Sequence, residues 1–225
     1  MNILLVYLRY EGDIYMDSYE QDHLGLSYIA SVLRDNGYTV TLINAHFLGL
    51  SWEELKEKIE LLDSGITWHF IGHLQTNKVK YIADKVDLIH SVDSIKLLKE
   101  INKRAAQKDR VINVLIQVNV ANDEAKFGIE TSDLEDFIKE ASEMTNIKVQ
   151  GLMTIVPFEI EKENLRPYFK KMNEIFDNMK NLKIDNVNMK YLSMGMTNDY
   201  DIAIEEGSNM VRIGTGIFGE RIYKK

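Results

Sequence analysis

The chain contains no cysteine, only two prolines and no long run of charges of one sign. The lack of cysteine excludes disulfides, thiolate nucleophiles and cysteine zinc sites, and it agrees with a reducing cytoplasm. Pro157 and Pro167 leave no proline-rich linker to divide the 225 residues. The net charge of -8 argues against a nucleic-acid groove or a patch for anionic membranes. We therefore expect one cytoplasmic domain with neither nucleic acid nor membrane among its partners.

The opening "MNILLVYLRYEGD" (1–13) has only a short apolar run before charged residues begin. That run is too short for a signal-peptide core with its cleavage site, or for a membrane span. We expect it to be the first β-strand.

Short apolar runs rich in β-formers alternate along the chain with stretches whose apolar residues recur at helical spacing. This alternation is typical of parallel strands joined by crossover helices. The expected strands are 2–8, 39–45, 68–74, 87–92, 113–120, 149–155, 190–195 and 210–216. Eight βα units favour a (βα)8 TIM-type barrel that forms a single domain over residues 1–225, and an open doubly wound sheet is the alternative.

The expected helices each place apolar residues on one face, as Leu97, Leu98 and Ile101 do. Ser132 with Glu135 matches the spacing of a capping box at the start of another helix. Gly207, after two glutamates, stands where a helix commonly ends.

The segment "NMVRIGTGIFGER" (209–221) suggests a binding site, because an arginine and a Gly-Thr-Gly turn follow an apolar strand. Gly214 and Thr215 are candidates to bind a phosphate through backbone N–H groups and a hydroxyl, aided by Ser193 at the end of the preceding strand. Arg212 alternates toward the barrel interior. The alternatives are a plain strand-to-helix turn and, for Arg212, a buried salt bridge.

From about residue 64 to 221 the sequence resembles the pyridoxal-phosphate homeostasis protein family, single-domain relatives of the alanine racemase barrel. The resemblance rests on five blocks of sequence in order and at matching spacing. They are "WHFIGHLQTNK" (68–78), "IHSVDS" (89–94), "VLIQVNVANDEAKFGI" (114–129), "GLMTI" (151–155) and "LSMGMTNDYDIAIEEGSNMVRIGTGIFGER" (192–221). The resemblance implies that Ser193, Gly214 and Thr215 bind the cofactor phosphate and that Arg212 faces the pyridine nitrogen, keeping it unprotonated.

The same family carries a Schiff-base lysine in a Ser-Lys-Thr-Lys segment after its first strand, and this chain has no such motif. Leu8 stands about where that lysine would fall. Residues 1–62 instead resemble the start of the flavodoxin-like cobalamin-binding domain of radical-SAM enzymes, through "LGLSYIASVLRDNGYTVTLINA" (24–45). We infer a chimera in which a flavodoxin-like segment (1–63) supplies two βα units and a pyridoxal-phosphate-barrel segment (64–225) supplies six.

Several lysines and histidines are further candidates for functional groups. Lys78 and Lys126 belong to family motifs and are candidates for a substitute imine, although ordinary lysines are protonated near neutral pH. His69, His73 and His90 lie on or beside strands without the spacing of a metal cluster, so structural roles are favoured. His23 and His46 are expected in loops.

These observations favour an engineered or recombined barrel scaffold with no catalytic residue, no metal and no evolved catalysis. It would bind pyridoxal phosphate weakly and noncovalently, or no cofactor. We expect a monomer whose partner is a phosphate-bearing small molecule. One alternative is a pyridoxal-phosphate-binding carrier or enzyme with a recruited lysine, and another is a cobalamin-binding module.

Overall fold

The structure is a computed structural model that describes residues 3–7, 40–44, 67–123, 127–157 and 161–213. The chain divides into two compact units, Trp68–Arg212 and Met1–Thr67 together with Ile213–Lys225. In the unit that holds the N-terminus, β1 (Ile3–Tyr7) pairs in parallel with β2 (Val40–Asn44). Both strands were predicted. The helices expected between residues 24 and 62 lie outside the described residues.

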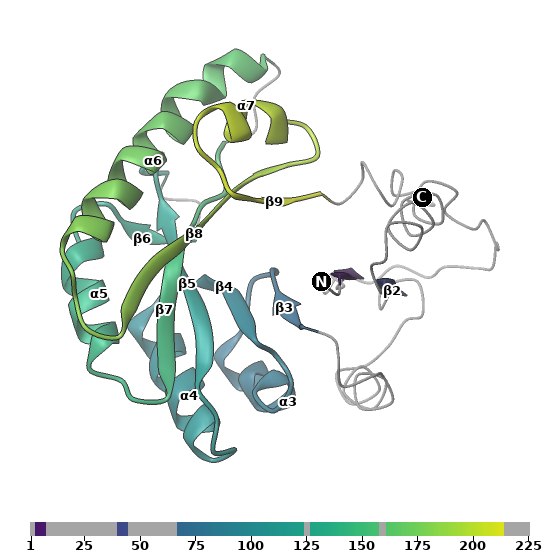
Figure 1. The fold of residues 1–225 in the computed structure, drawn as a ribbon, viewed down its shortest axis with the longest axis vertical. Helices are drawn as coiled ribbons and strands as arrows, with labels where there is room; N and C mark the ends of the chain where they lie inside the picture. The colour runs from purple at the N-terminus through teal and green to yellow at the C-terminus, as the bar shows by residue number, and fades with distance from the viewer. Residues whose placement is uncertain (1–2, 8–39, 45–66, 124–126, 158–160, 214–225) are drawn as a thin grey trace. The chain divides into compact units, whose positions relative to one another are not determined.

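The unit Trp68–Arg212 is built around a seven-stranded sheet in the order β3-β4-β5-β7-β8-β9, with β6 paired to β5 (Figure 1). Every pairing is parallel. The strands are β3 (His69–Phe70), β4 (Leu88–Val92), β5 (Ile112–Asn119), β6 (Ile129–Glu130), β7 (Ile147–Met153), β8 (Val187–Met196) and β9 (Met210–Arg212). Except for β6, each coincides with a predicted strand.

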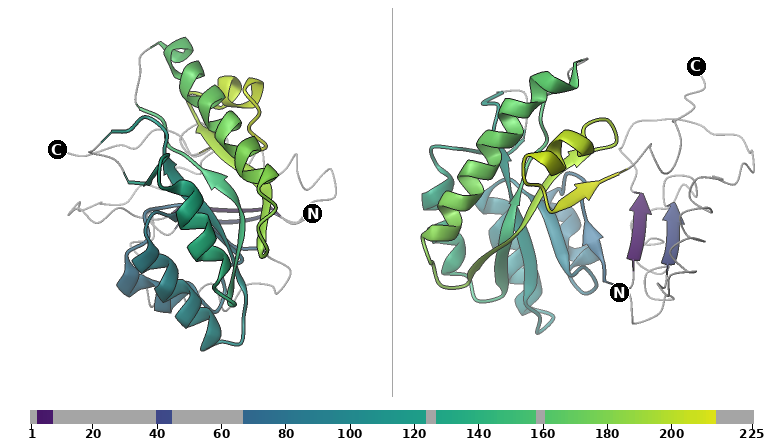
Figure 2. Two further views of the ribbon diagram at one scale, coloured as in Figure 1. Left: turned by 90° about the vertical axis from the view of Figure 1, so that its left-hand side faces the viewer. Right: turned by 45° about the horizontal axis from the view of Figure 1, so that its top comes forward.

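Helices connect these strands and lie along the outer side of the sheet (Figures 1 and 2). They are η1 (Thr76–Lys78), α3 (Val79–Ile82), α4 (Ile95–Ala106), α5 (Leu134–Ser142), η2 (Lys162–Leu165), α6 (Arg166–Asn181) and α7 (Tyr200–Glu205). In α4 the predicted apolar face is buried at Leu97, Leu98 and Ile101. After α7, Gly207 adopts a φ of 100° and its N–H donates to the Ile204 carbonyl, which confirms the predicted helix end.

The sheet is strongly curved, as the contact between His90 on β4 and Ser193 on β8 shows. Strands β5 and β7 lie between them, so a flat sheet would hold the two strands about 14 Å apart. The structure instead places His90 Nδ1 3.2 Å from Ser193 Oγ. The unit Trp68–Arg212 is therefore a parallel half-barrel of TIM-like type. The side chains of His90 and Ser193 meet on its concave side. Completion to eight βα units by the N-terminal residues remains a prediction.

Two details of the sequence-based prediction are wrong. The capping box is absent, because α5 begins at Leu134 with Asp133 as its N-cap, and the Ser132 hydroxyl donates to the Asp133 carboxylate. Strand β3 is much shorter than expected. After Phe70 the Gly72 carbonyl accepts a bond from the Ser91 side chain where a strand would accept one from backbone. Among the described residues, no helix is both long and apolar enough to span a bilayer.

Gly151 provides a test of the strand packing. It sits at an irregularity in the β7–β8 pairing with a φ of 145°, and a Cβ there would overlap the backbone of Tyr191. We expect Gly151→Ala to lower the free energy of unfolding in urea by about 3 kcal/mol or more.

Gly72 is the matched control, because among the described residues, its two chain neighbours apart, no atom lies within 4 Å of the position a Cβ would take there. We expect Gly72→Ala to change stability by less than about 1 kcal/mol. Equal losses in the two variants would contradict the described β7–β8 register.

Candidate functional site

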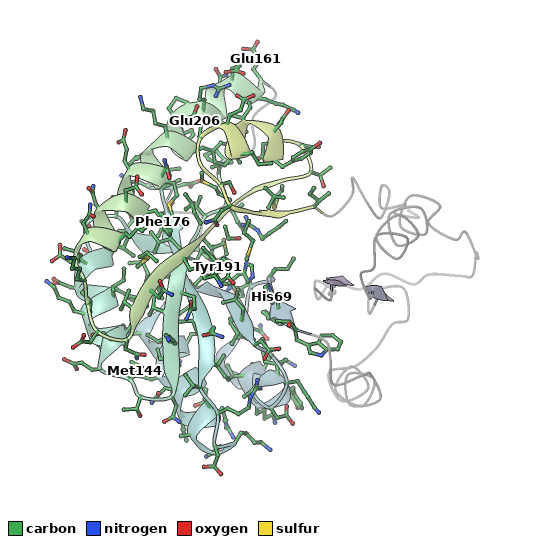
Figure 3. The ribbon with its side chains drawn as sticks, in the orientation of Figure 1. His69, Met144, Glu161, Phe176, Tyr191 and Glu206 are labelled. Atoms are coloured by element: carbon green, nitrogen blue, oxygen red, sulfur yellow. The ribbon has the colours of Figure 1, made fainter. Side chains whose placement is uncertain are left out.

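The inner side of the half-barrel has an apolar layer below a polar one. Leu88, Leu115 and Met153 form a buried cluster against which Tyr191 and Met210 pack. Side chains two residues apart on a strand face the same side, so the next inward positions toward the strand ends are His90, Ser193 and Arg212. In Figure 3, His69 and Tyr191 are labelled on the inner side of the sheet. The polar layer therefore lies at the carboxyl ends of the strands, where barrel proteins place their binding sites.

Arg212 ends β9 and joins it to its neighbours. Its Nη1 donates to Ser193 Oγ on β8 at 2.8 Å, and its Nη2 donates to the backbone carbonyl of Thr154, directly after β7, at 2.8 Å. Thr154 is held in turn, because its hydroxyl donates to the Val118 carbonyl on β5 at 2.8 Å. The guanidinium is thus fixed by two neutral oxygens from two other segments.

Among the residues that the structure describes, the buried charge of Arg212 has no partner carboxylate. The residue is 9% exposed, and within residues 67–123, 127–157 and 161–213 no carboxylate oxygen lies within 4.0 Å of its nitrogens. Burial lowers the pKa of Arg212 to about 10, partly opposed by the more distant Asp199, so the group stays charged at neutral pH. A buried charge that lacks a counter-ion is unfavourable, and an anion would offset that penalty.

Two histidines continue the polar layer. His90 Nδ1 lies 3.2 Å from Ser193 Oγ, and His90 Nε2 lies 3.2 Å from His69 Nδ1. Burial lowers the pKa of His90 to about 2, with further lowering from the charges of His69 and Arg212. Burial also lowers the pKa of His69, although Asp87 opposes it. Both imidazoles are therefore neutral at physiological pH.

Of the four predicted binding residues, the structure brings two together. Ser193, fully buried, and Arg212 are hydrogen-bonded to each other, and the salt bridge considered as the alternative for Arg212 does not occur among the described residues. Gly214 and Thr215 lie outside the described residues, as does Lys126. Lys78 ends η1.

Two further contributors were not predicted as site residues. The sequence pattern favours a structural role for His90 and gives no indication for Thr154, yet both are hydrogen-bonded within the network of Ser193 and Arg212. The alternation of side chains along β4 predicts that His90 faces inward, because His90 stands two residues after the inward-facing Leu88. In the described part of the chain, no group of three or more His, Asp or Glu residues is arranged to hold a metal ion.

The parallel half-barrel with a polar layer at the carboxyl ends of its strands is typical of an α/β barrel that binds a ligand at that end. The family described as "Alanine racemase, N-terminal domain" matches residues 31–222. A pyridoxal phosphate homeostasis protein of Aquifex aeolicus is 49% identical over 171 residues, which cover 76% of this chain and 74% of that protein. The chain belongs to the pyridoxal phosphate homeostasis protein family.

Solved structures have a similar fold. PipY of Synechococcus elongatus, without PLP, superposes with a TM-score of 0.71 at 26% identity, covering 86% of this chain and 87% of PipY. A second structure of PipY, described as having PLP bound, gives a TM-score of 0.69 at 24% identity over the same shares of the two chains.

The comparisons give no support to the flavodoxin-like, cobalamin-binding or chimeric interpretation of residues 1–62. The family match begins at residue 31 and so includes about half of that segment. Any βαβ unit shares the outline on which the flavodoxin-like resemblance was based, and this explains why the sequence pattern alone was ambiguous there.

The pKa of His90 generates a prediction for stability. Its folded value lies below the ordinary value of 6.5, so below pH 6.5 the unfolded chain binds a proton that the folded chain does not. The free energy of unfolding should therefore fall with decreasing pH by up to about 1.4 kcal/mol per pH unit from this group.

We expect His90→Leu to reduce this slope by about that amount between pH 6 and pH 5, measured by urea unfolding at each pH. Parallel pH profiles for the variant and the original protein would show that His90 is not held neutral.

Proposed function

We propose that this protein binds pyridoxal phosphate at the carboxyl ends of β8 and β9 and acts as a carrier of the cofactor. The observation that carries the proposal is the buried guanidinium of Arg212, bonded to Ser193 Oγ and the Thr154 carbonyl and lacking a carboxylate among the described residues. Such a site suits an anionic ligand with a ring nitrogen. The names of the relatives support the same cofactor.

The residues fit the cofactor in kind. Arg212 would face the pyridine nitrogen, and because arginine remains protonated it would keep that nitrogen unprotonated. Bound pyridoxal phosphate supplies an aldehyde and an electron-withdrawing ring, and an unprotonated ring is a weak electron sink. This environment favours storing and delivering the cofactor over turnover. It supports the pyridoxal-phosphate-binding alternative better than a scaffold that has no function.

The phosphate would be held by Ser193 together with Gly214 and Thr215. Ser193 is next to Arg212 in space, and two residues separate Arg212 from Thr215 in sequence. Backbone N–H groups at a Gly-Thr-Gly turn bind anions well, because the missing Cβ allows close approach. Their place in the sequence is therefore the reason to propose Gly214 and Thr215 beside Ser193 as phosphate-binding residues.

The mode of retention follows from the missing Schiff-base lysine. The chain has no Ser-Lys-Thr-Lys segment after its first strand, so we propose noncovalent retention through the phosphate and Arg212. Lys78 and Lys126 are the candidates for a recruited imine. Reduction with borohydride distinguishes the two modes.

We expect purified protein to show a saturable change in the absorbance of added pyridoxal phosphate. Arg212→Met should weaken this binding by about 10- to 100-fold, since a buried charge-assisted hydrogen bond contributes about 1.5–3 kcal/mol. Arg104→Met is the matched control, because Arg104 pairs with Glu100 on the outer helix α4. It should bind like the original protein.

After borohydride reduction, an unchanged intact mass is expected. A mass gain equal to one cofactor would show that a recruited lysine holds the cofactor covalently, and it would contradict noncovalent retention. Absence of saturable binding, or equal affinity in Arg212→Met, would contradict the proposed site.

A further inference from the structure

A continuous chain of hydrogen bonds runs from Arg212 through Ser193 and His90 to His69. The three heavy-atom distances are 2.8 Å, 3.2 Å and 3.2 Å. Arg212, Ser193 and His90 are buried, and His69 at the far end is partly exposed. The chain therefore connects the proposed ligand site to a group near solvent.

The direction of each bond follows from what the groups can donate. A guanidinium only donates, so Ser193 Oγ accepts from Arg212. A hydroxyl has one proton, and among the described residues the acceptor within reach of it is His90 Nδ1. His90 is neutral and accepts at Nδ1, so it carries its proton on Nε2 and donates to His69 Nδ1. His69 in turn carries its proton on Nε2.

This direction bears on the proposed phosphate site. The Ser193 hydroxyl donates its single proton in a hydrogen bond to His90. It can therefore only accept a hydrogen bond from a ligand, through a lone pair. Phosphate oxygens are acceptors and need a donor. A fully ionised phosphate has no proton to donate, so Ser193 can form a hydrogen bond to it only if the Ser193 proton is released from His90.

We propose that a phosphate bound at Ser193 reverses the hydrogen-bond chain, so that His90 and His69 both exchange the Nε2–H tautomer for the Nδ1–H tautomer. The inference rests on the proposed binding of pyridoxal phosphate. In the reversed chain Ser193 donates to the phosphate and accepts from both Arg212 and His90 Nδ1. His90 Nε2 then accepts from His69 Nδ1.

The protons balance in this exchange. The Ser193 proton passes to His90 Nδ1, the His90 Nε2 proton passes to His69 Nδ1, and the His69 Nε2 proton leaves to water. Ser193 Oγ receives one proton from water or from the ligand monoanion. The Ser193 hydroxyl keeps this proton and donates it in a hydrogen bond to the phosphate. Each imidazole remains neutral throughout, so no buried charge is created. An imidazole suits this role because it exchanges donor and acceptor nitrogens without moving its ring.

The direct test is long-range ¹H–¹⁵N correlation of the full chain labelled with ¹⁵N-histidine. The spectra of His90→Leu and His69→Gln assign the two signals among the five histidines. Without ligand, both residues should show the Nε2–H tautomer. Saturation with pyridoxal phosphate, or with inorganic phosphate as the smaller probe, should convert both to Nδ1–H.

Absorbance on the same samples reports whether the cofactor binds. Saturable binding with unchanged tautomers overturns the reversal and leaves cofactor binding intact. A free-state His90 protonated on Nδ1 also overturns it. If neither pyridoxal phosphate nor inorganic phosphate binds, the proposed function and the reversal both fail.

Affinity gives a second readout. His90→Leu removes the acceptor that holds the Ser193 proton, so this variant should bind pyridoxal phosphate no more weakly than the original protein. Ser193→Ala, which removes the donor, should bind more weakly. Loss of affinity in His90→Leu equal to that in Ser193→Ala would show that His90 does not restrain the Ser193 proton.

Discussion

The positive charge of Arg212, buried at the end of β9, is the constraint around which the described site is organised. One guanidinium draws together β8, through the Ser193 hydroxyl, and the end of β7, through the Thr154 carbonyl. The Thr154 hydroxyl extends this hold to β5. Both oxygens bonded to Arg212 are neutral, so within the described part of the chain its charge has hydrogen-bond acceptors but no counter-ion. That imbalance is what makes an anionic ligand the natural occupant of the proposed site.

The layering of the half-barrel separates stability from function. The apolar layer of Leu88, Leu115 and Met153 stabilises the fold by packing. In the polar layer above it, the buried side chains form hydrogen bonds. A buried polar network stabilises the fold only when each of its members is satisfied. Here the partners of Arg212, Ser193 and His90 are supplied by strands that are distant in sequence, so ordering of the site depends on curvature of the sheet.

Much of this could be predicted from sequence. Short apolar runs rich in β-formers located the strands, and alternation along the last strand placed Arg212 inward. Ser193 was expected at the end of the preceding strand. These patterns could not reveal the bond between His90 and Ser193, which spans 103 positions and exists only because the sheet curves. The Ser132 capping box was a wrong prediction because Asp133, one residue later, takes the N-cap position. Residues 1–62 were ambiguous because a single βαβ unit fits several α/β folds. The family match assigns only the part of this segment from residue 31 onward.

The central claim is that the buried charge of Arg212, which has no counter-ion among residues 67–123, 127–157 and 161–213, marks a pyridoxal phosphate site. A crystal structure of the protein grown with pyridoxal phosphate tests it most directly. The account predicts the phosphate within hydrogen-bonding distance of Ser193 Oγ and the Gly214–Thr215 turn, with Arg212 directed at the ring nitrogen. A cofactor bound elsewhere, or Arg212 paired with a carboxylate of this chain, would contradict it.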